Sequence, residues 1–255
     1  MLASSTVDWP AGAGWVLQSK YDGYRLLVET KAADRVCAWS RHGTSLTANL
    51  GELLAPIAAL GAGWVFDGEL IALTDRDGGP VQDFAAVGRA VFGGDQEAIA
   101  RLYYVAFDVL AAGDGGDIQA WPWLKRTTML TDRFPASRRL RVASSLPAEP
   151  DVHARLVSIG FEGSVLKRQN SSYRAGRFRS WRKLKAQHTI PATIRRLDRD
   201  RDGRLLARCV LANGRSCSAW VPATVEPTRE HATIIYSRVD ADGSLREPRL
   251  PPDQH

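Results

Sequence analysis

The segment Val16-Leu17-Gln18-Ser19-Lys20-Tyr21-Asp22-Gly23-Tyr24-Arg25 sets a lysine and an Asp-Gly turn directly after an apolar stretch. Its pattern predicts strands at Trp15–Ser19 and Tyr24–Thr30 with the turn at Lys20–Gly23 between them. Such a turn can present Lys20 to a cleft, where apolar walls and neighbouring cations lower the pKa of an amine enough for it to act as a nucleophile. Taken alone, the segment is equally compatible with a plain hairpin turn.

Lysine is rare in this chain, since only six of the 34 basic residues are lysines and the others are arginines. A guanidinium does not lose its proton in proteins and therefore cannot serve as a nucleophile. A lysine in an arginine-rich chain thus indicates a position where an amine is needed. The six are Lys20, Lys31, Lys125, Lys167, Lys183 and Lys185.

The length of 255 residues, with 44% hydrophobic and 24% charged residues, allows one large domain or two modest ones. It excludes collagen-like, coiled-coil and disordered chains. No apolar run approaches the roughly 20 residues of a membrane span, and the start does not have the layout of a signal peptide. We therefore expect a cytoplasmic, nucleoid-associated monomer that does not bind membranes.

The three cysteines lack CxxC spacing, so we expect them to be small buried residues and expect no disulfide framework or zinc site.

The net charge of +6 is concentrated in one stretch. Between Glu162 and Lys185 the sequence has eight basic residues and one acidic residue, so the remainder of the chain is about neutral. A local basic stretch of this kind indicates a polyanionic partner such as a nucleic acid.

The predicted secondary structure changes near residue 188, from mixed strands and helices to short strands alone. Residues 1–187 mix strands with helices expected near Leu50–Leu60, Asp83–Val91, Leu124–Phe134 and Val152–Ile159. Residues 188–255 contain short strands separated by Asp202-Gly203 and Asn213-Gly214, which are turn signals. The sequence thus predicts an α+β domain followed by a small all-β domain, and the pattern alone does not separate an OB fold from an SH3-like barrel.

Three more segments set charges beside apolar strands. Asp67-Gly68-Glu69 interrupts the strand Trp64–Leu73, and Glu162-Gly163 precedes the strand Gly163–Arg168. Buried carboxylates require a cationic partner, although a solvated surface turn remains the alternative for each. In Ser180–Lys185, alternation sends Lys183 and Lys185 to one face of a strand, where they could bind a phosphate or simply be solvated at a sheet edge.

Together, Lys-x-Asp-Gly-x-Arg, Asp-Gly-Glu, Glu-Gly and Lys-x-Lys in this order resemble the nucleotidyltransferase superfamily of ATP-dependent DNA ligases, RNA ligases and mRNA-capping guanylyltransferases. Four further segments are similar to the DNA ligase branch, above all to small bacterial ligases and the ligase domain of bacterial ligase D. They are Ser40–Thr47, Tyr104–Leu110, Tyr173–Arg177 and Leu245–Arg249. The resemblance implies an antiparallel-sheet adenylation domain over residues 1–187 and a shortened OB-fold domain over residues 188–255.

The resemblance also implies a three-step reaction. Lys20 would attack the α-phosphate of ATP to give lysyl-AMP, AMP would pass to the 5′-phosphate of a nick, and the 3′-hydroxyl would displace AMP from this DNA-adenylate. Glu69 and Glu162 would hold Mg²⁺ or Mn²⁺. The residues implied to bind ATP or the nick phosphate are Gln18, Arg25, Arg41, Glu69, Phe107, Arg177, Lys183, Lys185 and Arg246. Phe107 would stack on adenine, and Arg246 would orient pyrophosphate in the first step.

The sequence departs from the family pattern at three positions. Gln18 stands where Glu is usual, Ser164 replaces an aliphatic residue, and Phe178 replaces a second Arg. The expected substrate is nicked double-stranded DNA, with a DNA-repair polymerase or end-binding protein as a possible partner. The alternatives are an RNA ligase or capping-type guanylyltransferase that uses the same lysine, and a non-catalytic nucleic-acid-binding protein on a decayed ligase scaffold.

Overall fold

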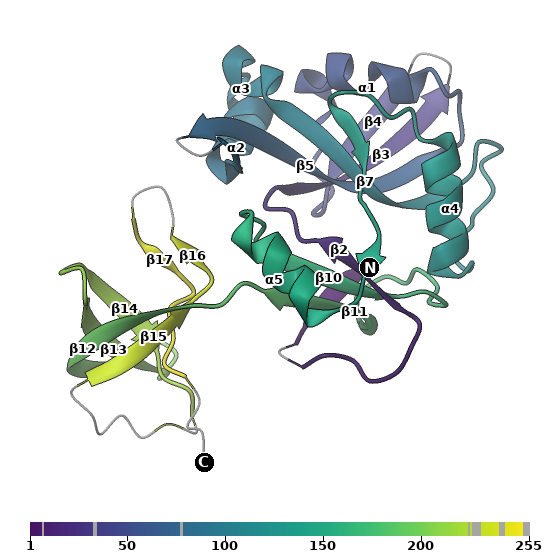
Figure 1. Cartoon of the computed structure of the whole chain (residues 1–255). Coiled ribbons are helices and arrows are strands. Elements are labelled where there is room, and N and C mark those ends of the chain that lie inside the picture. Colours follow the sequence, from purple (N-terminus) through teal and green to yellow (C-terminus); the bar gives the residue numbers. More distant parts are fainter. Residues whose placement is uncertain are drawn as a thin grey trace. The chain divides into compact units, whose positions relative to one another are not determined.

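The computed structural model describes residues 1–251 except residues 7, 33–34, 77–78, 224, 226–230 and 240–242. The chain divides into two compact units, Met1–Leu184 and Lys185–His255 (Figure 1). This division lies three residues before the predicted boundary between residues 187 and 188.

The first unit is built on two sheets. The first has the strand order β1-β11-β10-β2-β9, and the second has the order β4-β3-β5-β7-β8, with β6 paired to β5. The strands of the first sheet are β1 (Leu2–Ser5), β2 (Trp15–Ser19), β9 (Leu146–Pro147), β10 (Gly163–Arg168) and β11 (Arg177–Lys185). Those of the second are β3 (Tyr24–Ala32), β4 (Arg35–Ser40), β5 (Val65–Arg76), β6 (Gly79–Gln82), β7 (Leu102–Ala111) and β8 (Leu140–Val142). The pairs β1·β11 and β7·β8 are parallel, so neither sheet is purely antiparallel.

Five α-helices and one short 3₁₀ helix accompany the strands of the described residues. They are η1 (Thr47–Asn49), α1 (Gly51–Ala58), α2 (Phe84–Gly93), α3 (Gln96–Ala100), α4 (Trp123–Arg133) and α5 (Pro150–Ser158). The four predicted helices are confirmed with small shifts at their ends. α2 begins where it does because the Asp83 side chain caps it by accepting from the amide of Ala86 at 3.0 Å. It ends at Gly94, whose φ of 64° is a left-handed conformation that favours glycine. None of the helices in the described part of the chain is long and apolar enough to cross a membrane.

The largest core cluster lies around the second sheet. Phe66, Leu70 and Tyr104 are fully buried there, and α1, α2 and α4 contribute further apolar residues. The polar interruption of β5 has a structural reason, because the Asp67 carboxylate is buried and forms an ion pair with Arg25 of the adjacent strand β3.

β2 and β3 belong to different sheets and do not pair with each other. The plain hairpin alternative for Lys20–Gly23 is therefore wrong, and this turn carries the chain from one sheet to the other. Lys20 is tied to the first sheet because its amide donates to the carbonyl of Gly163 at 2.9 Å. Gly23 is required by a close approach, since a Cβ at this position would lie 2.1 Å from the carbonyl oxygen of Leu70.

The second unit contains the antiparallel sheet β14-β13-β12-β15 and the two-stranded ladder β16-β17. The strands are β12 (His188–Arg199), β13 (Leu205–Leu211), β14 (Ser216–Trp220), β15 (His231–Tyr236), β16 (Arg238–Val239) and β17 (Leu245–Arg246). Both predicted turns join consecutive strands, with φ values of 78° at Gly203 and 81° at Gly214. Ser237 separates β15 from β16.

The cysteines differ in burial. Cys209 belongs to the core of the second unit, whereas Cys37 and Cys217 are only partly buried. The prediction of three buried cysteines is therefore wrong for two of them.

Candidate functional site

A pocket of about 530 Å³ in the first unit gathers most of the predicted site residues. Its lining comes from the ends of strands in both sheets and includes Gln18, Lys20, Arg25, Arg41, Glu69, Phe107, Arg177 and Lys183. Glu162 reaches Lys20 directly, as described next, and the remaining two, Lys185 and Arg246, lie in the second unit.

Lys20 forms an ion pair with Glu162 at the pocket. The two residues are 142 positions apart and meet because β2 and β10 are antiparallel neighbours. The lysine side chain is 20% exposed and the glutamate 13%, so the pair is partly shielded while the amine stays accessible from the pocket. A carboxylate that accepts a hydrogen bond from the ammonium is in position to take its proton.

Glu69 supplies a second carboxylate to the same region. Burial raises its pKa to about 8, while Lys20 and Arg25 oppose this shift and Glu162 adds to it. Glu69 lines the pocket, and Glu162 reaches it through its ion pair with Lys20. Among the described residues no group of three or more His, Cys, Asp or Glu side chains could hold a metal ion. Two carboxylates beside an open pocket do fit Mg²⁺, which keeps several waters and is usually completed by substrate phosphates.

Gln18 lies in the wall of the pocket and is 2% exposed. Its Nε2 donates to the carbonyl of Ala143 at 3.2 Å, which fixes the orientation of the side-chain amide. Its Oε1 is buried and has no hydrogen-bond partner. A buried acceptor without a partner is costly, so a ligand that offers a donor here would relieve that cost.

Arg25 is held by a buried neighbour. Its Nε donates to Asp67 Oδ1 at 2.9 Å, and its terminal nitrogens donate to Asp67, to the carbonyl of Met1 and to the hydroxyl of Tyr173. Arg25 lines the pocket, but most of its donors are used within the protein. Its first role is therefore to hold Asp67 and the segment around Tyr173 in place.

Phe107 is half-buried and lines the pocket while it packs against Trp181 with a centroid distance of 6.0 Å. The ring is therefore part of the core and also part of the pocket wall.

Sequence reasoning missed Lys167, which also lines the pocket. Its Nζ donates to the carbonyl of Phe107 at 3.1 Å and lies 4.5 Å from the Phe107 ring centroid and 3.9 Å from that of Trp181. Burial lowers its pKa to about 7. Lys167 is one of the eight basic residues of the Glu162–Lys185 stretch, which predicted a polyanionic partner. It is only 2% exposed, however, so it does not face such a partner on the surface. The available signal was the scarcity of lysine together with its place at the end of the Glu162–Lys167 segment.

Ser164 has a polar partner that explains its departure from the family pattern. It is buried, and its Oγ lies 2.7 Å from Nδ1 of His153 on α5. The hydroxyl therefore replaces apolar packing with a hydrogen bond between β10 and α5.

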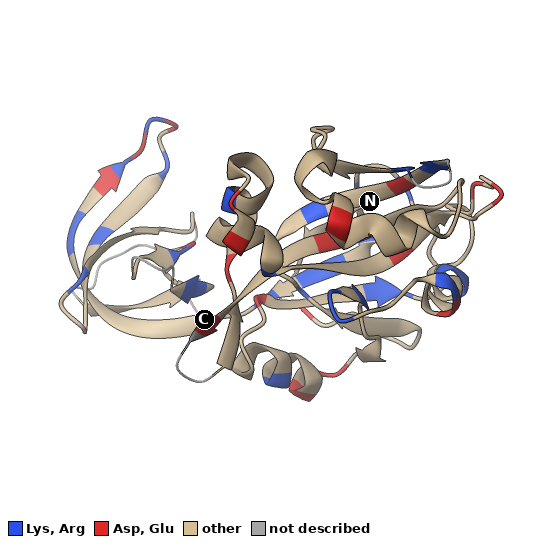
Figure 2. Cartoon of the chain, turned by 90° about the horizontal axis from the view of Figure 1, so that it is seen from above, with Lys and Arg blue, Asp and Glu red and all other residues tan. Residues whose placement is uncertain are grey.

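The remaining cations lie at the edge of the pocket and beyond it. Arg41 is exposed in the turn after β4, and alternation along β11 brings Arg177 and Lys183 to the pocket. Lys185 forms an ion pair with Glu247 inside the second unit. Arg246 lies opposite Arg238 in the register of the β16-β17 ladder. Basic residues are spread over the strands of the second unit (Figure 2).

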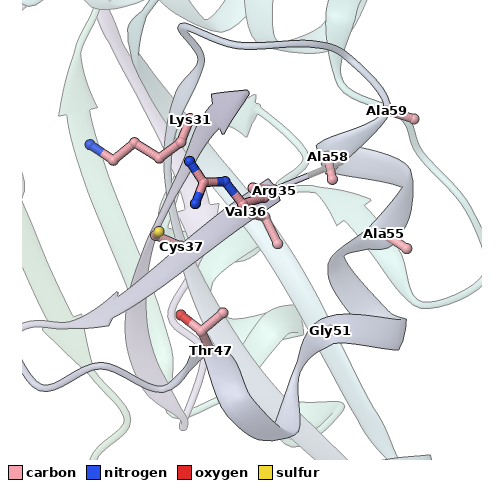
Figure 3. A pocket seen from close by; sticks show the side chains of 9 residues that line it. All are labelled: Lys31, Arg35, Val36, Cys37, Thr47, Gly51, Ala55, Ala58 and Ala59. Carbon is pink, nitrogen blue, oxygen red and sulfur yellow. The ribbon is translucent and has the colours of Figure 1, made fainter. Parts of the chain in front are cut away.

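A second hollow, of about 650 Å³, lies between β4 and α1 (Figure 3). Its charged residues are Lys31, which pairs with Glu29, and Arg35, and both are exposed. No predicted site residue lines this hollow, so the pocket around Lys20 is the candidate active site.

Comparison with known proteins points to one family. Residues 1–185 match the family model of the ATP dependent DNA ligase domain. The chain is 34% identical over 189 residues to the multifunctional non-homologous end joining protein LigD of Pseudomonas aeruginosa. It is 33% identical over 197 residues to a probable DNA ligase of Streptomyces griseus. Each match covers 72% of this chain, but only 21% of the Pseudomonas protein and 38% of the Streptomyces protein.

Two solved structures are similar over nearly the whole chain. The ligase domain of LigD from M. tuberculosis has a TM-score of 0.58 and 25% identity, with 98% of this chain and 94% of that chain covered. A Lig E DNA ligase has a TM-score of 0.66 and 17% identity, with 98% and 97% covered, which is a likeness of fold. The similarity thus extends through the small β domain at the end of the chain.

Proposed function

The chain belongs to the ATP-dependent DNA ligase domain family, and we propose that it seals 3′-hydroxyl/5′-phosphate nicks in double-stranded DNA with ATP. The observation that carries this proposal is the amine of Lys20, paired with Glu162 at a pocket that also contains Glu69, Phe107 and Gln18.

In the first step Glu162 takes a proton from the Lys20 ammonium and the free amine attacks the α-phosphorus of ATP. A phosphorus–nitrogen bond forms, the bond to the β-phosphate oxygen breaks, and pyrophosphate leaves. The AMP then passes to the 5′-phosphate of the nick, and the 3′-hydroxyl displaces it. Each transfer moves a phosphoryl centre, so its rate depends on in-line positioning and on neutralised charge.

Mg²⁺, or Mn²⁺, held by Glu69 and Glu162 would supply charge neutralisation at the phosphates. Lys183 adds a positive charge from the pocket wall, and Arg41 and Arg177 extend the positive edge toward the nick phosphate.

Adenine selection rests on Gln18. Because Nε2 is occupied by Ala143, the amide presents an acceptor, which suits the exocyclic amino group of adenine and not the O6 of guanine. We expect Gln18→Leu, which is similar in volume but has no acceptor, to lower kcat/KM for self-adenylation by about 10-fold. The readout is labelling with ATP and GTP in parallel, and an unchanged preference for ATP would contradict this role.

Arg246 is proposed to act on the pyrophosphate in the first step only, so its domain would take part in closure. We expect Arg246→Ala to reduce self-adenylation while joining of a pre-adenylated nick stays close to wild type. Arg249→Ala, three residues along the chain, is the matched control. Equal loss of both activities in Arg246→Ala would contradict the assignment.

We further propose that the second unit is a shortened OB fold that grips DNA together with the basic stretch of β11, and that Lys185 contributes to phosphate binding. This unit has twelve basic and nine acidic residues, so its attraction to DNA would weaken strongly with salt. A monomer in the nucleoid that works with a repair polymerase or an end-binding protein is the setting we propose. The name of the Pseudomonas relative, a non-homologous end joining protein, supports a link to repair.

The test is incubation of the chain with Mg²⁺ and α-labelled ATP, GTP or NAD, followed by a chase with nicked DNA or nicked RNA. Acid-labile label from ATP alone that nicked DNA discharges is the expected result. Label from GTP, or discharge by RNA alone, would favour the guanylyltransferase or RNA ligase alternative. No label from any donor, with DNA binding retained, would favour a decayed scaffold.

A further inference from the structure

The strands β13 and β14 are neighbours in the sheet of the second unit (Figure 1). Their register places Cys209 directly opposite Cys217. Cys209 belongs to the core cluster of the second unit, and Cys217 packs against the same cluster. The thiol of Cys209 donates to the carbonyl of Ala207 at 3.6 Å. We propose that this pair is a modification site, at which a small-molecule disulfide converts the two thiols into a reversible cross-strand disulfide.

The position of the pair in the ladder predicts how such a bond would behave. The backbone amide of Leu211 donates to the carbonyl of Arg215 at 2.7 Å, and the backbone amide of Val221 donates to the carbonyl of Leu205 at 3.1 Å. Continued by one residue at each end, the register of β13 and β14 places Leu211 opposite Arg215 and Leu205 opposite Val221. On β13, Leu211 and Leu205 are each an even number of residues away from Cys209. Because hydrogen-bonded and non-hydrogen-bonded pairs alternate, Cys209 and Cys217 occupy a hydrogen-bonded position.

At such a position the Cα atoms are about 5.5 Å apart, which a disulfide accepts. The Cβ atoms are also about 5.5 Å apart, whereas a relaxed disulfide needs roughly 3.5–4.5 Å. The two strands must therefore twist to bring the sulfurs into bonding distance. A strained disulfide is reduced more easily than a structural one, so the bond would open and close with the redox state of the surroundings.

The exchange balances with a disulfide such as oxidised glutathione. The Cys217 thiolate, on the more exposed residue, attacks one glutathione sulfur and releases a first glutathione thiolate. The Cys209 thiolate then attacks the Cys217 sulfur and releases the second. The protein loses two electrons and its two thiol protons, and the glutathione disulfide gains two electrons to give two thiols.

Burial controls the rate of this reaction. It raises the pKa of Cys217 to about 11 and also raises that of Cys209, so few thiolates exist at neutral pH. We therefore expect slow oxidation that accelerates as the pH rises. Cys37 serves as an internal control, because the residue opposite it on β3 is Glu29 and no second thiol can resolve a mixed disulfide there.

The experiment uses the full chain with Cys37→Ser, so that only the pair can react. The protein is incubated with oxidised glutathione, quenched with an alkylating agent under denaturing conditions, and measured by intact mass. The expected result is a mass about 2 Da below that of the reduced protein, without alkylation and without a glutathione adduct. In Cys37→Ser/Cys209→Ser, Cys217 should instead retain one glutathione.

Two results would overturn the proposal. One is a persistent glutathione adduct, or two alkylated thiols, in the chain that retains both cysteines. The other is an internal disulfide that excess reduced glutathione fails to open, which would make the bond a permanent staple. In the wild-type chain we expect an internal disulfide together with one glutathione on Cys37. This result would support the proposal, because the unpaired thiol would keep its adduct while the paired thiols would not.

Discussion

Lys20→Ala is expected to lower covalent adenylation of the protein by at least about 10³-fold, because it removes the only atom that bonds to AMP. Lys20→Arg should be equally inactive. It retains a positive charge that can pair with Glu162, yet a guanidinium cannot lose its proton to attack. The measurement is protein-bound label from α-labelled ATP after denaturation.

Two controls separate chemistry from folding and binding. Lys31→Ala removes an exposed lysine of the same unit that pairs with Glu29, and it should label at the wild-type rate. The Lys20 variants should still seal a nick that is already adenylated, since the third step uses the DNA-adenylate and not the lysine. Substantial label in Lys20→Arg would mean that another group is the nucleophile.

The sequence predicted the individual strands and helices better than their arrangement. Periodicity and turn residues located the strand Gly163–Arg168 at its observed bounds and the helix capped by Asp83 within two residues. β1 was not predicted, because its four residues become a strand only by pairing with β11, more than 170 residues away. The short strands β8 and β9 have the same origin, since they exist through pairing with β7 and β2.

The same distinction holds for the pocket. The order of the motifs, through its resemblance to the nucleotidyltransferase superfamily, pointed to Lys20, Glu69 and Glu162, although each motif taken singly was compatible with a solvated turn or a plain hairpin. Burial, in contrast, depends on tertiary contacts. The sequence therefore could not show that Lys167 points inward against Phe107 or that Arg25 is committed to Asp67.

Asp108→Ala should destabilise the first unit by about 3–5 kcal/mol, because it leaves a buried guanidinium without its carboxylate. Asp108 and Arg126 are both 0% exposed and meet through two hydrogen bonds of 2.8 Å. For a unit of this size the loss corresponds to a fall in Tm of roughly 10 °C. Seven of the eight tryptophans lie in residues 1–184, so thermal unfolding followed by tryptophan fluorescence reports on this unit.

The matched control is Asp132→Ala, which removes an exposed aspartate from α4 and should change stability by no more than about 0.5 kcal/mol. The double variant Asp108→Leu/Arg126→Met removes both charges, and it should recover most of the loss because apolar replacement of a buried ion pair is often neutral. Arg126 also donates to the carbonyls of Trp121 and Ser171, which hold the segment after β10 against α4. If Asp108→Ala unfolds at the same temperature as Asp132→Ala, those carbonyls satisfy the guanidinium without its carboxylate. The ion pair would then not be what anchors this segment to α4.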